Sequence, residues 1–282
     1  MFENVIGNEP IKKMLEQAIL NNKVSHSYMF LGVSGIGKKM LAREFAIKVL
    51  EVEDNENIPD LLYIEPDGNS IKIEQIREMQ KRVQEKPIGA SRKVYIIDDA
   101  DKMTKEAQNC LLKTLEEPPE FATIILIGTN ENAFLTTIKS RCMILHFNKI
   151  GDEQLKKYLQ ENFNMQNITQ NMLEMYQGSI GKAIYLKDKE NIYQELENVV
   201  KQISTKDLIE ITKSAEILYK EKDEIYEMLD YMNILLLKQA KEDYRYTNCI
   251  QIVENTKKRL KQNANYDMSI DNMLFNISEE IA

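Results

Sequence analysis

The sequence predicts an α/β fold in which helices cover both faces of a parallel sheet, followed by a second half built only of helices. Before Gly151 the chain alternates short apolar runs with amphipathic stretches of helical spacing. The runs do not alternate apolar with polar residues, which is typical of strands that helices cover on both faces. All six prolines lie in the first 119 residues, and beyond Gly151 the only glycines are Gly178 and Gly181. The second half therefore has few residues that break helices.

Five apolar runs are the expected strands of the first half. They cover residues 28–31, 61–64, 94–97, 124–127 and 143–147. Between them we expect helices from Lys38 to about residue 50, over residues 71–85 and over residues 104–115. The third helix ends at the Glu-Glu-Pro-Pro segment 116–119, because proline cannot continue a helix. A parallel five-stranded sheet is the expected result.

From residue 152 onward the sequence predicts only helices, separated at 164–168, at 178–181 and near Ser204, Asp223 and Tyr244. We expect three domains: an α/β domain over 1–150, a small helical domain over 151–190 and an all-α C-terminal domain over 191–282. One helix of the last domain carries an apolar stripe, which we interpret as bundle core. The stripe is Ile225, Met228, Leu229, Met232, Leu235 and Leu236.

Composition and charge limit the class of protein. The chain has 282 residues, 43% of them hydrophobic and 29% charged, which is ordinary for a globular protein of two or three domains. No apolar run reaches the roughly 18 residues of a membrane span, and the N-terminus lacks the features of a secretory signal. Three separated cysteines and two histidines offer no zinc cluster, so we expect a cytoplasmic protein without a metal site. A net charge of −8 means that the average surface would not attract nucleic acid.

Three of the ten glycines, Gly32, Gly35 and Gly37, lie within six residues that follow the first expected strand and precede a helix. This is the context of a P-loop, in which backbone N–H groups surround phosphate oxygens and the next residue, Lys38, reaches the β- and γ-phosphates. The expected ligand of such a loop is ATP or ADP. The alternative is a glycine-rich turn that binds nothing.

Two positions weaken this nucleotide site. The residue after Lys38 should be Ser or Thr, whose hydroxyl binds Mg²⁺, but it is Lys39, whose ammonium has no lone pair and repels the metal. Asp98 and Asp99 follow the third strand, where a metal-holding Asp and a catalytic acid belong, and the second acid is one methylene shorter than the usual Glu. Phosphate binding can survive these changes, whereas Mg²⁺-dependent hydrolysis should suffer. Alternatively, both aspartates only end the strand and cap the helix from residue 104.

Five segments in order carry a resemblance to a known family. They are FENVIGNE at 2–9, SHSYMFLG at 25–32, KVYIID at 93–98, NCLLKTLEEPP at 109–119 and SRC at 140–142. On these segments the first 185 or so residues resemble the AAA+ clamp-loader subunits of bacterial DNA polymerase III, and most closely the delta-prime subunit. A P-loop is common to many proteins, but LLKTLEEPP followed by Ser-Arg-Cys is a narrow combination.

The resemblance implies roles for single residues. ATPase members carry an Arg in a helical lid, and here the lid motif at 178–183 has Gly181 at that place, with Lys182 one step off register. Thr129 stands where the family has a polar sensor, or is simply a satisfied hydroxyl. By resemblance, Arg141 is an arginine finger that inserts across an interface against the γ-phosphate in a neighbouring ATPase subunit. Otherwise it caps a helix or makes a surface ion pair.

The resemblance also implies DNA contact at the helix after the second strand. In the family this helix faces duplex phosphates, and here Lys72 and Arg77 stand at matching positions. Glu74 and Glu78 lie beside them, and a helix of such mixed charge is usually only a solvated face. Many members carry a four-cysteine zinc module after the P-loop helix, but the segment 51–57 has no cysteine, so we expect no zinc there.

The function implied by the resemblance is that of a delta-prime-like subunit that helps load the sliding clamp onto primed DNA. Its domains would be an AAA+ P-loop domain, a lid and an oligomerisation collar, with no polymerase active site. Lys39, Asp99 and Gly181 favour a subunit with impaired or absent ATPase activity. The implied partners are the gamma/tau ATPase and delta subunits, the clamp and primed DNA.

Two alternatives remain for the function. One is a competent gamma/tau-like ATPase subunit, in which Lys39 replaces part of the Mg²⁺ charge. The other is an unrelated P-loop ATPase, which the segments at 109–119 and 140–142 disfavour.

Overall fold

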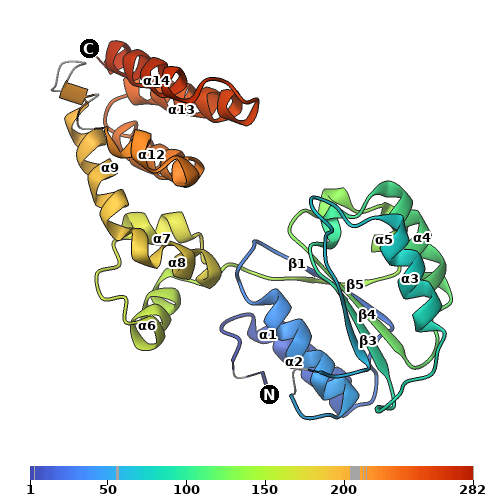
Figure 1. Cartoon of the computed structure of the whole chain (residues 1–282). Helices are drawn as coiled ribbons and strands as arrows, with labels where there is room; N and C mark the ends of the chain where they lie inside the picture. The colour runs from blue at the N-terminus through green and yellow to red at the C-terminus, as the bar shows by residue number, and fades with distance from the viewer. Residues whose placement is uncertain (3, 55–56, 204–209, 212, 214, 282) are drawn as a thin grey trace. The chain divides into compact units, whose positions relative to one another are not determined.

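The computed structural model describes residues 1–282 except 3, 55–56, 204–209, 212, 214 and 282 (Figure 1). The chain forms two compact units. The first comprises Met1–Leu155 and Gly178–Lys182, and the second comprises Lys156–Gln177 and Ala183–Ala282. The polar break expected near residue 204 lies outside the described residues. The three-domain division at residues 150 and 190 stays a prediction.

The first unit is built on a five-stranded sheet. Its strands are β1 (Ser27–Leu31), β2 (Leu61–Ile64), β3 (Lys93–Ile97), β4 (Ala122–Gly128) and β5 (Met143–His146). They lie in the order β2-β3-β4-β1-β5, and every neighbouring pair is parallel. The predicted parallel five-stranded sheet is confirmed, and each of the five predicted runs coincides with a strand.

The helices of the sheet unit are the three predicted ones, with two additions, at residues 9–20 and 136–139. They are α1 (Glu9–Leu20), α2 (Lys38–Leu50), α3 (Ile73–Val83), α4 (Lys105–Glu116) and the short α5 (Thr136–Lys139), with 3₁₀ turns η1 (Ala100–Lys102) and η2 (Glu131–Ala133). Helix α1 was not among the predicted elements, because it precedes the first strand and fills no gap between strands. Pro10 stands in its first turn, where the missing N–H costs nothing, and Ile11 and Leu15 are buried.

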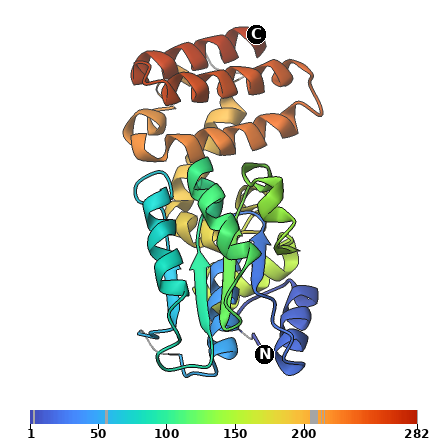
Figure 2. The same ribbon diagram turned by 90° about the vertical axis from the view of Figure 1, so that its right-hand side faces the viewer.

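Strand side chains alternate between two apolar cores, one on each face of the sheet. Tyr28 and Phe30 pack in one core with residues of α1 and α2. Met29 and Leu31 belong to the other core, with residues of α3, α4 and α5. In Figure 1 the two sets of helices lie on opposite sides of the strands, and Figure 2 looks onto the side of α3 and α4. This double cover explains why the strand sequences are apolar throughout.

The candidate site lies where the parallel strands end, because parallel strands place their carboxyl ends at the same edge of a sheet. The loop 32–37 follows β1, Glu65 follows β2, Asp98 follows β3 and Thr129 follows β4. All four strand ends contribute to one edge of the same sheet. The fold therefore assembles the polar residues that the sequence spreads over about a hundred positions.

The secondary structure of the second unit, where it is described, consists of helices joined by loops. Its helices are the C-terminal part of α6 (Asp152–Phe163), α7 (Gln170–Tyr176), most of α8 (Ile180–Leu186), α9 (Glu190–Gln202), α11 (Ile217–Lys220), α12 (Ile225–Gln239), α13 (Arg245–Lys261) and α14 (Tyr266–Ile281), with 3₁₀ turns η3 (Lys187–Lys189) and η4 (Lys222–Glu224). Helix α12 packs against α7, α9 and α13, and α13 packs against α14. Its predicted stripe from Ile225 to Leu236 is buried, which confirms it as core. Within the described part of the chain, no helix is both long and apolar enough for a membrane span.

Candidate functional site

The loop between β1 and α2 has the backbone that a P-loop needs. Gly35 has φ +74° and Gly37 has φ +93°, a region that disfavours residues with a Cβ atom. Gly37 is the N-cap of α2, so the loop leads directly into the N-terminus of that helix. The positive end of the helix dipole and its unpaired N–H groups therefore lie at the loop, which is the usual chemistry of phosphate binding.

Lys38 is bound within the loop itself. Its side chain is buried, and its Nζ donates to the carbonyl oxygens of Gly32 and Val33, at 2.7 Å each. Burial lowers the pKa of Lys38, and the carboxylates of Asp101, Asp98 and Asp99 oppose this shift. The ammonium is thus held at the loop, as phosphate binding requires, but two loop carbonyls already accept its hydrogen bonds.

Lys39 lies between two carboxylates at the ends of neighbouring strands. Its Nζ is 2.9 Å from Asp98 Oδ2 and also forms an ion pair with Glu65. Burial lowers the pKa of Lys39, but hydrogen bonds and charge interactions with Glu65 and Asp98 outweigh it, and the net shift is upward. The side chain therefore stays charged, and the ammonium neutralises the carboxylate that would hold a metal. Glu65 was not identified from the sequence, although it follows β2 just as Asp98 follows β3.

Asp99 pairs with a different lysine. It adopts φ +48°, and its Oδ2 pairs with Lys102 Nζ at 2.7 Å. Asp98 accepts the N–H of Asp99 at 3.1 Å through its other oxygen. Neither aspartate caps the following helix, because the hydroxyl of Thr104 accepts the N–H of Ala107 at the N-terminus of α4. The capping interpretation is therefore wrong, and the catalytic interpretation of Asp99 stays a prediction.

Thr129 is fixed by an acid that sequence reasoning missed. Its hydroxyl donates to Asp101 Oδ2 at 2.8 Å, and the same oxygen accepts the N–H groups of Thr129 and Asn130. Asp101 follows Asp98 by three residues, so the acidic run after β3 was the available signal. The sensor position is thus tied to the turn after β3 and has a satisfied hydroxyl.

The lid segment, residues 178–182, packs directly on the phosphate loop. The N–H of Gly181 donates to the carbonyl of Gly35 at 2.9 Å. A Cβ atom on Gly181 would lie 2.9 Å from Gly35 Cα, so this approach requires glycine at position 181. Lys182 donates its N–H to the hydroxyl of Ser179, which stabilises the turn. In this arrangement no arginine fits at the place where ATPase members carry one.

Arg141 lies in the turn between α5 and β5. Its guanidinium forms an ion pair with Glu116 Oε1 at 2.8 Å and donates to the carbonyl of Thr137 at 2.9 Å. Within this chain it therefore makes the surface ion pair and the helix contact that were its alternative interpretation. Its side chain is 34% exposed. The finger role requires a second subunit and stays a prediction.

The two predicted DNA contacts differ in their surroundings. Lys72 precedes α3 and pairs with Asp67 at 2.8 Å, whereas the exposed Arg77 has no ion-pair partner among the described residues. Lys81, one turn after Arg77, is also exposed and without an ion-pair partner in the described chain; the sequence analysis did not single it out.

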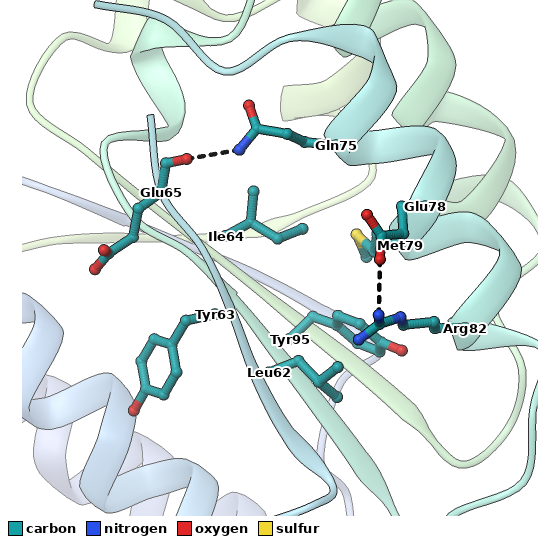
Figure 3. Close-up of a pocket in the computed structure, with 9 residues that line it drawn as sticks. All are labelled: Leu62, Tyr63, Ile64, Glu65, Gln75, Glu78, Met79, Arg82 and Tyr95. Carbon is teal, nitrogen blue, oxygen red and sulfur yellow. Dashed lines mark hydrogen bonds and ion pairs between the residues drawn. The ribbon is translucent and has the colours of Figure 1, made fainter. Parts of the chain in front are cut away.

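A pocket of about 190 Å³ between β2 and α3 contains other residues of this helix (Figure 3). Gln75 donates to the carbonyl of Glu65, and Glu78 pairs with Arg82. An acidic residue of α3 thus forms an ion pair with a basic residue of the same helix. Arg77 is not among the residues that line the pocket. No group of His, Cys, Asp and Glu in the described part of the chain could hold a metal ion.

The fold and the loop define an AAA+ P-loop protein. A sequence model described as "DNA polymerase III, delta subunit" matches residues 7–151, which is just over half of the chain. The chain belongs to this family. The resemblance noted in the sequence is thereby confirmed.

Individual relatives include both delta′ and tau subunits of DNA polymerase III. The chain is 30% identical to DNA polymerase III subunit delta′ of Bacillus subtilis over 209 residues, covering 68% of this chain and 62% of the relative. It is 36% identical to DNA polymerase III subunit tau of the same organism over 171 residues, covering 55% of this chain and 30% of the relative. The chain thus spans between about a third and three fifths of these relatives.

A solved structure supports the fold. The gamma subunit-related protein of Thermotoga maritima superposes with a TM-score of 0.53 at 20% identity, covering 95% of this chain and 99% of that chain. At this identity the similarity concerns the fold alone.

Proposed function

We propose that this chain is a non-hydrolysing, delta-prime-like subunit of the DNA polymerase III clamp loader, which helps load the sliding clamp onto primed DNA. The observation that carries the proposal is the ammonium of Lys39, which lies between Asp98 and Glu65. A Mg²⁺ ion at this carboxylate would meet a cation that has no lone pair to offer. The residues present therefore do not fit the metal, and no hydrolytic step in this chain runs through it.

Nucleotide binding without turnover is compatible with the loop. Three glycines, the N-terminus of α2 and Lys38 supply the donors for phosphate oxygens. Binding requires that Lys38 release the carbonyls of Gly32 and Val33. The lid segment contributes a glycine backbone to the loop rather than an arginine side chain.

Arg141 is the residue through which this chain acts on a neighbour. Its guanidinium is partly exposed and permanently charged, so it suits the stabilisation of charge on a transferred phosphoryl group. We assign it as an arginine finger for an ATPase subunit of the gamma/tau type. A finger of this kind contributes on the order of 10³–10⁵ in rate at the site it serves.

Partners follow from the same proposal. The helical second unit would join the collar with the gamma/tau and delta subunits, and the first unit would approach primed DNA through α3. Arg77 and Lys81 support this contact, because neither has an ion-pair partner in the described part of the chain, whereas Lys72 is paired with Asp67. A few basic side chains of this kind can contact DNA phosphates even though the chain as a whole has a net charge of −8.

A competent gamma/tau-like ATPase is the second candidate. It is favoured by the 36% identity to a tau subunit and by the retained Lys38. In that case the ammonium of Lys39 replaces part of the metal's charge.

The test of the proposed function is Arg141→Ala in the reconstituted complex. We expect the variant to assemble, as judged by size-exclusion chromatography, and to lower the DNA-stimulated ATPase rate of the complex. Lys139→Ala is the matched control, because it removes a cation from the same segment, where Lys139 pairs with Glu131. An unchanged ATPase rate in the assembled Arg141→Ala complex would remove the finger assignment.

A further inference from the structure

The position of the Arg141 backbone is fixed by the core of the sheet unit. The hydroxyl of Ser27, at the start of β1, donates to the carbonyl of Arg141 at 2.5 Å, and the N–H of Arg141 donates to Ile138 at 3.0 Å. The neighbouring Cys142 is held in the same turn, and burial raises the pKa of its thiol to about 11, so it is inert at neutral pH. Only the long side chain of Arg141 needs further ordering.

That ordering comes from three acceptors that contact the two Nη atoms of the guanidinium group. Nη2 pairs with Glu116 Oε1 at 2.8 Å, while Nη1 donates to Thr137 O at 2.9 Å and to Ser140 Oγ at 3.3 Å. An arginine has five N–H donors. Among the described residues, the Nε–H and one N–H of Nη2 have no partner. The side chain is therefore held while two donors remain available to an anion.

Glu116 differs from the other two acceptors because it comes from a distant segment. It is the last residue of α4, and Glu117, Pro118 and Pro119 follow it, so the helix cannot continue past this point. The carboxylate is therefore presented from the end of a packed helix. The side chain of Arg141 is 34% exposed and that of Glu116 is 49% exposed, and ion pairs with such exposure to solvent are weak. The ion pair can therefore order the guanidinium group and still allow it to bind another anion.

We propose that Glu116 is a positioning residue that orders the side chain of Arg141 for contact with the neighbouring subunit's phosphate. This inference rests on the proposed function, because it presupposes that Arg141 acts in trans. It gives the Glu-Glu-Pro-Pro segment a physical role: the prolines end α4 at Glu116, and Glu116 orders the finger. Without the carboxylate, the long side chain must be ordered anew each time it meets the phosphate.

The experiment compares four variants in the assembled complex: Glu116→Gln, Glu117→Gln, Arg141→Ala and the double variant Glu116→Gln/Arg141→Ala. We expect Glu116→Gln to lower the DNA-stimulated kcat by about two- to tenfold, the cost of ordering one long side chain, with KM for ATP nearly unchanged. Glu117→Gln removes the same charge one residue away and should leave kcat unchanged. The double variant should match Arg141→Ala, because Glu116 acts only through Arg141.

The outcomes separate this inference from the proposed function. If Arg141→Ala lowers kcat while Glu116→Gln leaves it unchanged or raises it, the positioning role is wrong and the finger assignment stands. If Glu116→Gln lowers kcat further in the Arg141→Ala background, Glu116 acts by another route and the inference also fails. If Arg141→Ala has no effect, the finger assignment fails, and the positioning role fails with it. Size-exclusion chromatography of each complex controls for assembly.

Discussion

Replacing Lys39 with Thr tests whether one ammonium keeps Mg²⁺ away from the phosphate loop. Lys39 Nζ lies 2.9 Å from Asp98 Oδ2. A Mg²⁺ ion bound by the same oxygen would lie about 2.1 Å from it, so the two cations would be about 5 Å apart or closer. Charges of +1 and +2 at about 5 Å repel each other by about 1.7 kcal/mol even in water, and by more at a lower dielectric constant. That repulsion corresponds to about a 20-fold loss of affinity.

The substitution should leave the fold intact. The side chain of Lys39 is 51% exposed, and its partners Glu65 and Asp98 are 56% and 21% exposed. Ion pairs near the surface contribute about 1 kcal/mol or less each, which is a small part of the stability of a domain. Threonine also offers the hydroxyl that a P-loop uses as a metal ligand. The variant therefore removes the repulsion and restores a ligand in one step.

The assay is equilibrium binding of a fluorescent ATP analogue to the isolated protein, with Mg²⁺ and with EDTA. For the parent protein we expect no gain of affinity from Mg²⁺, and for Lys39→Thr a gain of about 20-fold or more. Lys48→Thr is the matched control, because it makes the same change at an exposed position of α2. The reasoning is refuted if the parent binds more tightly with Mg²⁺, or if Lys39→Thr is as insensitive to the metal as the parent.

Two further predictions concern the stability of the sheet unit. The buried carboxylate of Asp60 accepts three N–H groups of residues 88–90 at 2.7–2.9 Å, so Asp60→Asn should lower the free energy of unfolding by about 2 kcal/mol. Burial raises the pKa of Asp60, but these hydrogen bonds outweigh it, and the net shift is downward. Urea titrations should therefore find the stabilisation above about pH 4 and its loss as the pH falls further. A difference between the two proteins that does not depend on pH would contradict this prediction. Gly181→Ala should cost about 1–3 kcal/mol in the same titrations, because its Cβ would lie 2.9 Å from Gly35 Cα. Gly151→Ala meets nothing within 4 Å and should be silent, and equal effects of the two would refute the packing argument.

The pattern of apolar residues in the sequence was sufficient to predict the sheet. Five apolar runs without alternation predicted five covered strands, because each strand side chain meets helices on one face or the other. Helix α1 was missed, since it precedes the first strand, and its Pro10 reads locally as a turn. The chemistry of single residues could also be predicted from the sequence. An ammonium group in place of a hydroxyl cannot be a metal ligand, whatever the conformation of the side chain.

The partners of those residues were not readable from the sequence. Glu65 contacts Lys39 from 26 positions away, and Glu116 contacts Arg141 from 25 positions away, across a whole strand. Periodicity describes local structure, whereas such pairs depend on the order of strands in the sheet. The sequence showed that position 181 has glycine where an arginine was expected. The close approach of Gly181 to Gly35, however, is a property of the folded backbone alone.

The most direct test of the account is ATP turnover by the isolated chain in the presence of Mg²⁺. The ammonium between Asp98 and Glu65, the pairing of the Asp99 carboxylate with Lys102 and the glycine at position 181 together predict no turnover above the uncatalysed rate. Mg²⁺-dependent hydrolysis by the purified chain that is lost in Lys38→Ala would contradict this prediction and would identify the chain as an ATPase subunit in its own right.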